Sequence, residues 1–371
     1  MAAVSVRPSS AAVEEIEVSA YRIPTDMPSE SDGTLVWTET TLVVVEAQAG
    51  GVTGLGYTYA DVATARPIAN VLADVVHGRD AMATAAIWQA MVSHVRNIGQ
   101  AGMASMAIAA VDVALWDLKA RLLDVPLVTL LGAVRDAAPV YGSGGFTSYS
   151  IERLRDQLSS WVDAGIERVK MKVGRDSHAD VRRVAAARAA IGEHAELFVD
   201  ANGAYDRKLA LAQAERFAEE RVSWFEEPVV YWDLEGLRLC RDRAPAGMEI
   251  SVGEYGYAMS DFQRLLDAQA TDVLQADATR CQGITGLLIV DALCEARGVP
   301  LSTHCAPSLH VHPACALKRL RHIEYFHDHV RIEHLLFDGA LTPVDGALHP
   351  DLSRPGLGLE FKHADARQFA F

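Results

Sequence analysis

Ionisable side chains end one short apolar segment after another in the second half of this 371-residue chain. In chain order they are Lys170 with Lys172, Asp200 with Asn202, Glu226 with Glu227, Glu254, Asp277, His304 and Glu324. Each apolar segment is typical of a buried strand, and a single charge at a strand end is ordinarily a surface or capping residue. A succession of strands that all end in this way is hard to explain by stability alone, so the set predicts an active site.

The first of these segments, residues 168–174, places two lysines on one face. Side chains alternate along a strand, so Lys170 and Lys172 point to one side while Met171 and Val173 point to the other. Two ammonium groups on an interior face are costly unless anionic groups lie opposite them. We therefore expect carboxylates from other strands to face the lysine pair.

Three carboxylates, those of Asp200, Glu226 and Glu254, end three successive predicted strands. If they converge without a cation, they repel one another and raise one another's pKa. An all-oxygen ligand set on rigid strands suits a hard divalent cation, with Mg²⁺ the first choice and Mn²⁺ the second. Zinc is less suited, because no His or Cys joins the three.

Two side chains are expected to act as acid or base beside this metal. Lys172 is the first, and both Lys170 and the metal are expected to lower its pKa toward neutrality. His304 is the second, with Asp277 expected to accept a hydrogen bond from its ring. Glu324, if protonated, donates to a developing oxyanion, and Lys170 meets the charge of the substrate. This set suits removal of a proton next to a carboxylate, through an enediolate.

The elements that position these residues alternate between short apolar strands and amphipathic helices. The predicted strands are 140–146, 168–174, 197–201, 222–226, 249–254, 273–276, 300–304 and 322–325. Eight strands with helical crossovers predict an α/β fold, a parallel (β/α)8 barrel with its active site at the carboxyl ends of the strands. An open doubly wound sheet is the alternative, but no Gly-x-Gly-x-x-Gly follows the early strands.

A smaller α+β domain is predicted over residues 15–135, before the barrel at 136–345. Its strands are predicted at 16–23, 40–47 and 52–57, and its helices at 64–77, 82–97 and 104–123. Residues 1–14 are expected to form a flexible tail, and 346–371 to pack back on the first domain. Between the first two strands, residues 24–37 are rich in Asp, Ser, Pro and Gly, which favours a lid or a disordered loop.

Composition and charge narrow the classes of partner and compartment. A net charge of −15 argues against nucleic acid or an anionic membrane as partner. No apolar run approaches the ~20 residues that a membrane helix needs, and the first residues lack the core of a signal peptide. The five cysteines are scattered, which predicts the cytoplasm. Cys305 follows His304, and we expect a small core residue there rather than a nucleophile.

The motifs, in their order and spacing, resemble the enolase superfamily and in particular its mandelate racemase-like branch. The matching segments are Lys-Met-Lys (170–172), Val-Asp-Ala-Asn (199–202), Phe-Glu-Glu-Pro (225–228), Gly-Glu (253–254), Asp-Ala (277–278), Ser-Thr-His (302–304) and Ile-Glu-Tyr (323–325). The helix over 109–117 also resembles the N-terminal capping domain of that branch. One segment differs: the branch often has Lys-x-Gly-Gly after Asp-Ala, where this chain has Arg280, Cys281, Gln282 and Gly283.

The resemblance implies a modified barrel with a capping domain and the same site roles. Asp200, Glu226 and Glu254 are then the Mg²⁺ ligands, Lys172 and His304 the acid/base pair. Asp277 is the partner of His304, and Glu324 is an electrophile. Residues 24–37 are implied to close over the substrate, and a homo-oligomer is implied.

The reaction remains open at this point among several classes. An acid-sugar dehydratase that acts on an aldonate or aldarate is favoured, since the branch often has that activity when the full residue set is present. A racemase or epimerase of a 2-hydroxy acid and a sugar-lactone cycloisomerase are the alternatives, each with a small carboxylate substrate. The non-enzymatic alternative is a metal-binding structural module.

Further residues are candidates for substrate contacts. They are Asn202, Tyr57 and His310, besides Lys170; Tyr59 and Asp61 are weaker ones. The pairs His310 with His312 and His327 with His329 have the His-x-His spacing of a metal site. We expect them to be polar residues of loops or helix starts instead.

Overall fold

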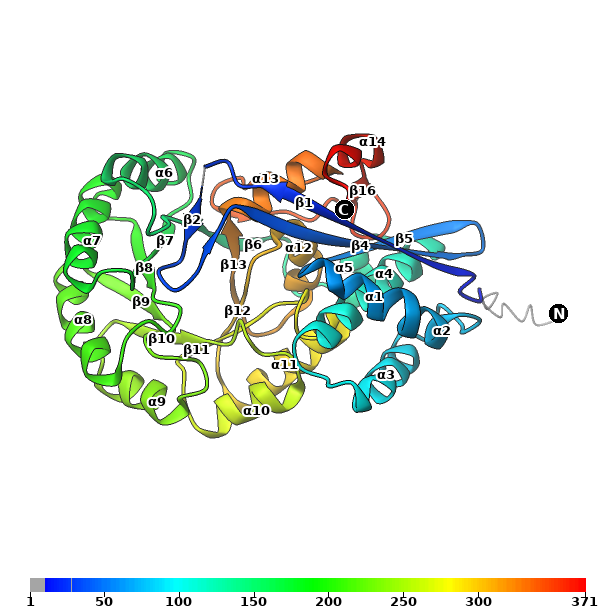
Figure 1. Ribbon diagram of the computed structural model, residues 1–371, viewed down its shortest axis with the longest axis horizontal. Coiled ribbons are helices and arrows are strands. Elements are labelled where there is room, and N and C mark those ends of the chain that lie inside the picture. Colours follow the sequence, from blue (N-terminus) through cyan, green and yellow to red (C-terminus); the bar gives the residue numbers. More distant parts are fainter. Residues whose placement is uncertain (1–10, 28) are drawn as a thin grey trace.

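The computed structural model describes residues 11–27 and 29–371. It consists of a barrel and, beside it, a three-stranded sheet with its own helices (Figure 1). Eight parallel strands pair in the order β6 to β13, and β13 pairs back onto β6, so the barrel is closed. The strands are β6 (Ala138–Gly144), β7 (Arg168–Lys172), β8 (Glu196–Asp200), β9 (Val222–Glu226), β10 (Glu249–Val252), β11 (Val273–Ala276), β12 (Leu301–Thr303) and β13 (Leu320–Phe326).

A helix follows each barrel strand and covers its outer side (Figure 1). These helices are α6 (Ile151–Asp163), α7 (Ser177–Ile191), α8 (Arg207–Glu219), α9 (Leu234–Arg243), α10 (Met259–Asp267), α11 (Gly283–Arg297), α12 (Pro307–Ala316) and α13 (His327–Leu336). Several begin at a capping side chain: Asp176 Oδ1, for example, accepts from the backbone N–H groups of His178 and Ala179. The predicted modified (β/α)8 barrel is confirmed.

The barrel interior is filled below the site by large rings. Tyr141, Phe198, Trp224 and Val273 form one buried cluster, contributed by four different strands. Lys170 Nζ lies 5.3 Å from the centre of the Tyr141 ring. This aromatic layer keeps polar side chains out of the barrel centre, so they gather above it, toward the carboxyl ends of the strands.

The capping domain places one long helix against an antiparallel sheet. The sheet order is β1-β4-β5, and α4 packs on it. The elements are β1 (Glu15–Pro24), β4 (Glu39–Ala49), β5 (Val52–Tyr59), η1 (Val62–Thr64), α1 (Ala65–Pro67), η2 (Ile68–Leu72), α2 (Ala73–Val76), α3 (Thr84–His94), η3 (Val95–Asn97), α4 (Met103–Leu122) and α5 (Leu127–Leu131). Gly56 permits the close approach, because a Cβ there would lie 2.2 Å from the carbonyl oxygen of Ala110.

The helix predicted over 64–77 is divided into shorter pieces. η1 is a 3-10 turn and η2 a π-helical turn, with α1 and α2 on either side of η2. Pro67 ends α1, and proline has no N–H for the helical ladder. Hydrophobic spacing does not report this change of hydrogen bonding, and Pro67 was the available signal of the break.

Residues 24–37, which we call the cap loop, contain a short hairpin. Its strands are β2 (Glu30–Ser31) and β3 (Val36–Trp37). Asp32 Oδ1 accepts from the N–H groups of Thr34 and Leu35 at 2.7 and 2.8 Å, which fixes the turn. The hairpin is docked on the barrel, since Thr147 N donates to the carbonyl oxygen of Ser31 at 2.8 Å.

The end of the chain returns to both domains. Its elements are β14 (Phe337–Asp338), β15 (Ala347–Leu348), β16 (Glu360–Phe361), α14 (His363–Ala366) and η4 (Arg367–Phe369). β15 pairs with the start of β6, and Phe371 N donates to Ala20 O in β1. No helix among the described residues is long and apolar enough to cross a membrane.

The predicted flexible tail over 1–14 is wrong for its last four residues. Val13 is buried, and its N–H donates to the carbonyl oxygen of Arg79 at 2.8 Å. An isolated apolar side chain among small residues gave no periodic signal, yet it fills a place in the capping-domain core. Residues 1–10 lie outside the described part of the chain.

Candidate metal and acid/base site

The three predicted metal ligands lie together at the carboxyl end of the barrel. Asp200 ends β8, Glu226 ends β9, and Glu254 follows β10. Their ligand atoms lie within 4.8 Å of one another, and all three side chains are buried. Glu226 Oε1 has no hydrogen-bond partner. A buried, unpartnered oxygen within an all-oxygen donor set fits a hard divalent cation.

The charge balance around this triad also fits a cation. Six carboxyl groups (Asp200, Glu226, Glu227, Glu254, Asp277 and Glu324) are buried beside three permanently basic side chains (Lys170, Lys172 and Arg280). Burial, followed by the charge of Asp200, raises the pKa of Glu226 to about 8. A divalent cation would offset most of the excess negative charge and keep these carboxylates ionised.

The lysine pair faces carboxylates, as the alternation along β7 predicts. Lys170 Nζ lies 2.7 Å from Glu226 Oε2 and 2.8 Å from Glu324 Oε1. Lys172 donates to Asn202 Oδ1 at 3.0 Å and also to Asp200. Lys172 and Asn202 line the open cleft, whereas Lys170 is fully buried beneath it.

The prediction that the pKa of Lys172 falls toward neutrality depends on the metal, since Lys170 does not lower it far enough. Burial disfavours the ammonium, but the Asp200 carboxylate outweighs burial and holds the pKa of Lys172 above its ordinary value. The opposing effect of Lys170 is weaker, because Glu226 and Glu324 match the charge of Lys170. A divalent cation on Asp200 acts in the opposite direction and favours the free amine.

His304 is held by Asp277 in the predicted way. Its Nδ1 donates to Asp277 Oδ2 at 2.8 Å, which leaves Nε2 facing the cleft, 3.3 Å from Glu254 Oε2. Burial opposes the imidazolium, yet neighbouring negative charge holds the pKa of His304 well above its ordinary value. Burial raises the pKa of Cys305 to about 12, so Cys305 is an uncharged thiol at neutral pH. The negative charge that raises the pKa of His304 therefore comes from the neighbouring carboxylates.

Glu324, which was expected to donate to an oxyanion if protonated, faces a fixed cation. It lies within β13, where it accepts from Cys305 N at 3.0 Å and pairs with Lys170. Burial raises its pKa, but the Lys170 ammonium outweighs burial and holds the pKa of Glu324 below its ordinary value. The carboxyl group is therefore ionised in this arrangement, because a fixed cation stands directly beside it.

Two predicted substrate contacts are wrong. Tyr57 is fully buried and donates to Glu333 Oε1 at 2.7 Å, stacked on Phe337, so it does not line the cleft. His310 is also fully buried: its Nδ1 lies 2.9 Å from Cys305 O, and its Nε2 accepts from Ala278 N at 2.9 Å. With both ring nitrogens used, His310 supports the backbone on either side of the site.

The other histidines of the two His-x-His pairs also have local roles. His312 lies buried within α12, where its Nδ1 accepts from Val128 N at 3.2 Å. His327 and His329 lie in the first turn of α13, as expected of helix-start residues. His329 lines the cleft, and its Nδ1 accepts from Ala306 N at 3.2 Å.

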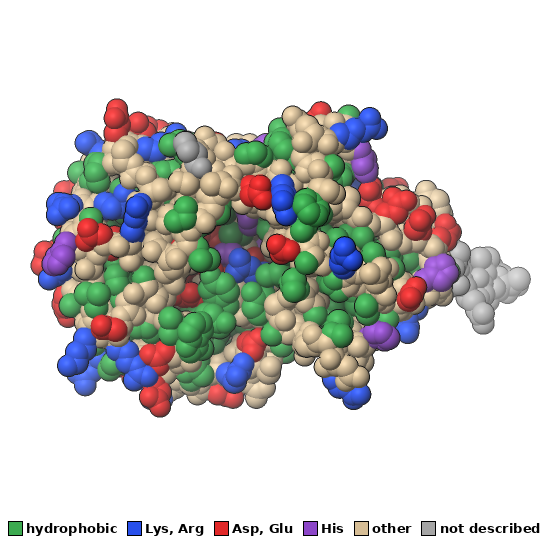
Figure 2. Space-filling view, viewed as in Figure 1, with side chains coloured by type: hydrophobic (Ala, Val, Ile, Leu, Met, Phe, Trp, Pro, Cys, Tyr) green, Lys and Arg blue, Asp and Glu red, His purple; other side chains and the backbone are tan. Residues whose placement is uncertain are grey.

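The cleft above the site has a volume of about 620 Å³. In the view of Figure 2 it opens as a hollow in the barrel face, with basic and histidine side chains at its floor. Its walls come from the cap loop, the capping domain and the strand ends of the barrel. Several lining residues were not singled out from the sequence, among them Trp37, Tyr255, Arg280 and Asp328. Arg280 was noticed only as a departure from the branch; its place after Asp277 was the available signal.

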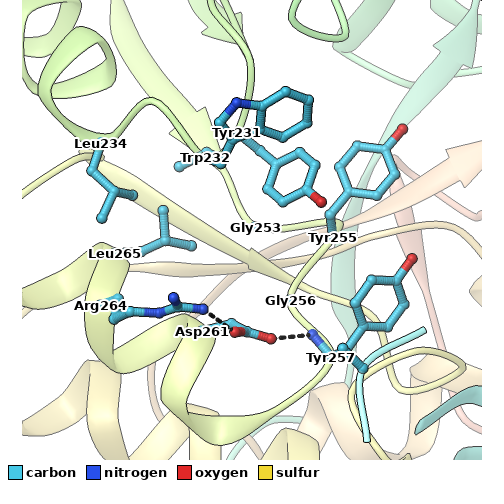
Figure 3. A pocket seen from close by; sticks show the side chains of 12 residues that line it. Tyr231, Trp232, Leu234, Gly253, Tyr255, Gly256, Tyr257, Asp261, Arg264 and Leu265 are labelled. Carbon is cyan, nitrogen blue, oxygen red and sulfur yellow. Dashed lines mark hydrogen bonds and ion pairs between the residues drawn. The ribbon is translucent and has the colours of Figure 1, made fainter. Parts of the chain in front are cut away.

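A second hollow of about 340 Å³ lies beside the cleft (Figure 3). Tyr231 and Tyr255 stack there with ring centres 4.8 Å apart, and Tyr255 also lines the cleft. Its one ion pair, Asp261 with Arg264, lies at a helix start, where Asp261 also accepts from the N–H of Tyr257. The metal triad and the acid/base residues do not line this hollow.

Fold and site together define a class: a (β/α)8-barrel protein with three buried carboxylates that fit a cation, beside a cleft lined by a lysine and a histidine. Residues 153–366 match the family model "Enolase C-terminal domain-like". Residues 15–132 match "Mandelate racemase / muconate lactonizing enzyme, N-terminal domain". The chain belongs to the mandelate racemase-like branch of the enolase superfamily and is an enzyme, a lyase or an isomerase.

Characterised and solved relatives span nearly the whole chain. A 3,6-anhydro-alpha-L-galactonate cycloisomerase of Streptomyces coelicolor is 33% identical over 359 residues, 94% of this chain and 98% of the relative. A mandelate racemase/muconate lactonizing enzyme-like protein from Rubrobacter xylanophilus is 54% identical, with a TM-score of 0.95 over 97% of this chain and 100% of the other. L-Talarate dehydratase from Polaromonas sp. JS666, solved with Mg and L-glucarate, is 31% identical, with a TM-score of 0.85 over 98% of each chain.

Proposed function

We propose that this enzyme removes the proton α to the carboxylate of an acid sugar with the help of Mg²⁺ and then expels the β-hydroxyl group as water. The observation that carries the proposal is the convergence of Asp200, Glu226 and Glu254 beneath a cleft that Lys172 and His304 both line. The dehydratase relative, which was solved with Mg and L-glucarate, supports the substrate class.

Each residue of this chain has a distinct task in the proposed reaction. Lys172 and His304 face the same cleft from different strands, so one removes the α-proton and the other protonates the departing hydroxyl. The C–H bond breaks, its electron pair forms the enediolate, and this collapses as the β C–O bond breaks. Water leaves, and the enol that remains becomes a 2-keto-3-deoxy acid.

The remaining groups prepare the site for the charge that develops. When bound by the three carboxylates, Mg²⁺ supplies positive charge to the substrate carboxylate and so lowers the free energy of the enediolate. Lys170 pairs with Glu226, keeps Glu324 ionised and adds a second positive charge from below. Asp277 holds the His304 ring with Nε2 toward the substrate.

Cycloisomerisation of a sugar lactone is the second candidate. It uses the same α-proton chemistry, with a ring oxygen as the group displaced, and the Streptomyces relative carries that name. The two reactions differ in whether water is released. A racemase or epimerase uses the same residue pair but returns the proton to the opposite face of the α-carbon.

The test is a screen of aldonic acids, aldaric acids and their lactones with Mg²⁺ in D₂O. We expect exchange of the α-proton, detected by NMR, together with loss of water for at least one acid. EDTA or Glu226→Gln should abolish both signals, because the triad loses the metal or a ligand. Lys172→Ala and His304→Asn should abolish turnover while circular dichroism shows an intact fold. Full activity in both variants would contradict the two-residue assignment.

A further inference from the structure

The lysine and arginine side chains of the cleft all come from one of its two walls, the barrel wall. Lys172 and Arg280 are the two Lys or Arg side chains among its described lining residues, and both come from the barrel, close to the metal triad. Lys172 pairs with Asp200, and Arg280 NH1 lies 3.6 Å from Glu254 Oε1. The positive charge of the cleft is thus gathered where the reacting carboxylate is proposed to bind.

The other wall, formed by the cap loop, the capping domain and α13, is acidic and hydroxylic, and we call it the cap side. It is lined by Asp32 of the cap loop, by Glu39, Thr40, Thr41, Tyr59 and Asp61 of the capping domain, and by Asp328 of α13. Asp32 and Asp61 each accept hydrogen bonds from nearby backbone N–H groups through Oδ1, which positions them without neutralising them. No lysine or arginine of the described residues joins them in the lining.

Two arginines near the cap side, Arg22 and Arg331, are paired with acidic side chains. Arg22 lies 3.4 Å from Glu39, and Arg331 lies 3.5 Å from Asp328; neither lines the cleft. His329 lines the cleft, but burial holds its pKa well below its ordinary value, so it is neutral. A carboxylate placed at the cap side would therefore face carboxylates without a free cation, and like charges in a confined cleft repel.

We infer that the substrate is a monocarboxylic polyhydroxy acid, an aldonate or its lactone, rather than an aldarate. This inference rests on the proposed function. Its carboxylate lies at the metal, and its distal hydroxyl groups donate to the acidic side chains of the cap side. Carboxylates accept such hydrogen bonds well, and hydroxyl groups are neutral, so they are not repelled by the acidic side chains. The cap side is thus a specificity surface that rejects a second carboxylate.

The experiment compares acids that differ only at the distal carbon. D-Galactonate with galactarate, and D-gluconate with D-glucarate, have a CH₂OH or a carboxylate at C6 on the same carbon skeleton. With Mg²⁺, we expect kcat/KM for water loss or α-proton exchange to favour the aldonates by about tenfold or more. An aldarate that is used equally well or better would overturn the inference but support the proposed function. Exchange with no acid of either class would overturn both.

A charge added to the cap side should shift this preference. Leu35 lies in the cap-loop hairpin, lines the cleft and is 65% exposed, so its replacement leaves the core untouched. Leu35→Arg is expected to raise the aldarate-to-aldonate ratio of kcat/KM several-fold, through a cation opposite the distal group. Leu35→Gln, which removes the apolar side chain without adding charge, should leave the ratio near that of the wild type. An unchanged ratio in Leu35→Arg would count against the cap side as the surface that meets the distal carbon.

Discussion

The His304 ring depends on one contact for its orientation. Asp277 Oδ2 accepts from Nδ1 at 2.8 Å, while Asp277 Oδ1 accepts from Thr279 N at 2.7 Å. The carboxylate is therefore held by its own backbone and in turn holds the ring. Because Nδ1 is bonded to Asp277, Nε2 is the ring nitrogen that faces the cleft. The orientation of His304 is thus set by a residue that does not line the cleft itself.

Asp277→Asn should lower turnover by about 10–100-fold, the usual cost of losing such a partner. The amide keeps the shape of the carboxylate but removes the charge that stabilises the imidazolium and fixes the tautomer. The measurement is kcat for the best substrate of the screen, together with the midpoint of thermal unfolding with and without Mg²⁺. The Mg²⁺-dependent shift of that midpoint should persist, because Asp277 lies outside the triad.

Asp156→Asn is the matched control, since Asp156 is exposed on α6 and lines no part of the cleft. Its activity should equal that of the wild type. Undiminished turnover in Asp277→Asn would show that His304 needs no oriented partner.

At the scale of elements, the cap loop is anchored by buried acids. Glu30 of β2 is fully buried; its Oε1 accepts from the hydroxyl of Tyr149 at 3.3 Å, and its Oε2 has no partner. Burial, followed by the charges of Asp328 and Asp26, raises the pKa of Glu30 to about 10. Arg331 and Arg153 pair with those two aspartates and leave Glu30 unmatched. A proton on Glu30 is therefore part of what docks the cap loop.

Wild-type stability should fall as the pH rises from about 7 to 10. The folded protein keeps a proton on Glu30 that the unfolded chain releases near pH 4.5, so this contribution is complete below that pH and is lost as the pH approaches 10. The slope is at most about 1.4 kcal/mol per pH unit. Glu30→Gln, which is neutral at every pH, should flatten this slope; the thermal midpoint of both proteins measured across the range is the check. Parallel curves would mean that Glu30 is ionised in the folded state.

Sequence patterns predicted the strands of the barrel and the charged ends of those strands, because apolar runs and polar ends are local signals. They did not predict which charges meet. Lys170 and Glu324 are about 150 residues apart in the chain. They are in contact because only β6 separates β7 from β13 in the closed sheet. Sequence patterns also could not tell which of Tyr57 and Tyr59 reaches the cleft. Both point to one side of β5, but only Tyr59, at the end of the strand, lines the cleft.

The cap-loop hairpin was also beyond prediction. β2 and β3 have two residues each, which is too short for a periodic signal. The buried acid of β2, Glu30, contacts Tyr149 and lies near Asp328, and both are far from it in the chain. Likewise, the difference from the family pattern at Arg280 did not indicate which residues this side chain contacts. Only the fold shows that this cation reaches back to the carbonyl oxygen and carboxylate of Glu254.

At the scale of the whole molecule, the capping domain holds the segment that carries Asp277 and Arg280. Several hydrogen bonds tie the segment after β11 to that domain; for example, Thr58 Oγ1 donates to Thr279 O at 2.7 Å, and Trp88 Nε1 donates to Gln282 O at 2.9 Å. Asp112 of α4 adds two more, as it accepts from Thr285 N at 2.9 Å and from Thr285 Oγ1 at 2.7 Å. The capping domain therefore does more than cover the cleft, since it also positions one wall of it.

Asp112→Ala should weaken this attachment and lower both stability and activity. It leaves the N–H of Thr285 at the start of α11 without its buried acceptor, which costs about 1–3 kcal/mol. The thermal midpoint from calorimetry should fall by several degrees. Turnover should also fall at a temperature where the variant is fully folded, because Arg280 and Asp277 lie on the loosened segment. Asp74→Ala, which removes an exposed acid from the same domain, should change neither quantity. A variant with a lower midpoint but wild-type turnover would show that the capping domain stabilises the barrel without positioning the site.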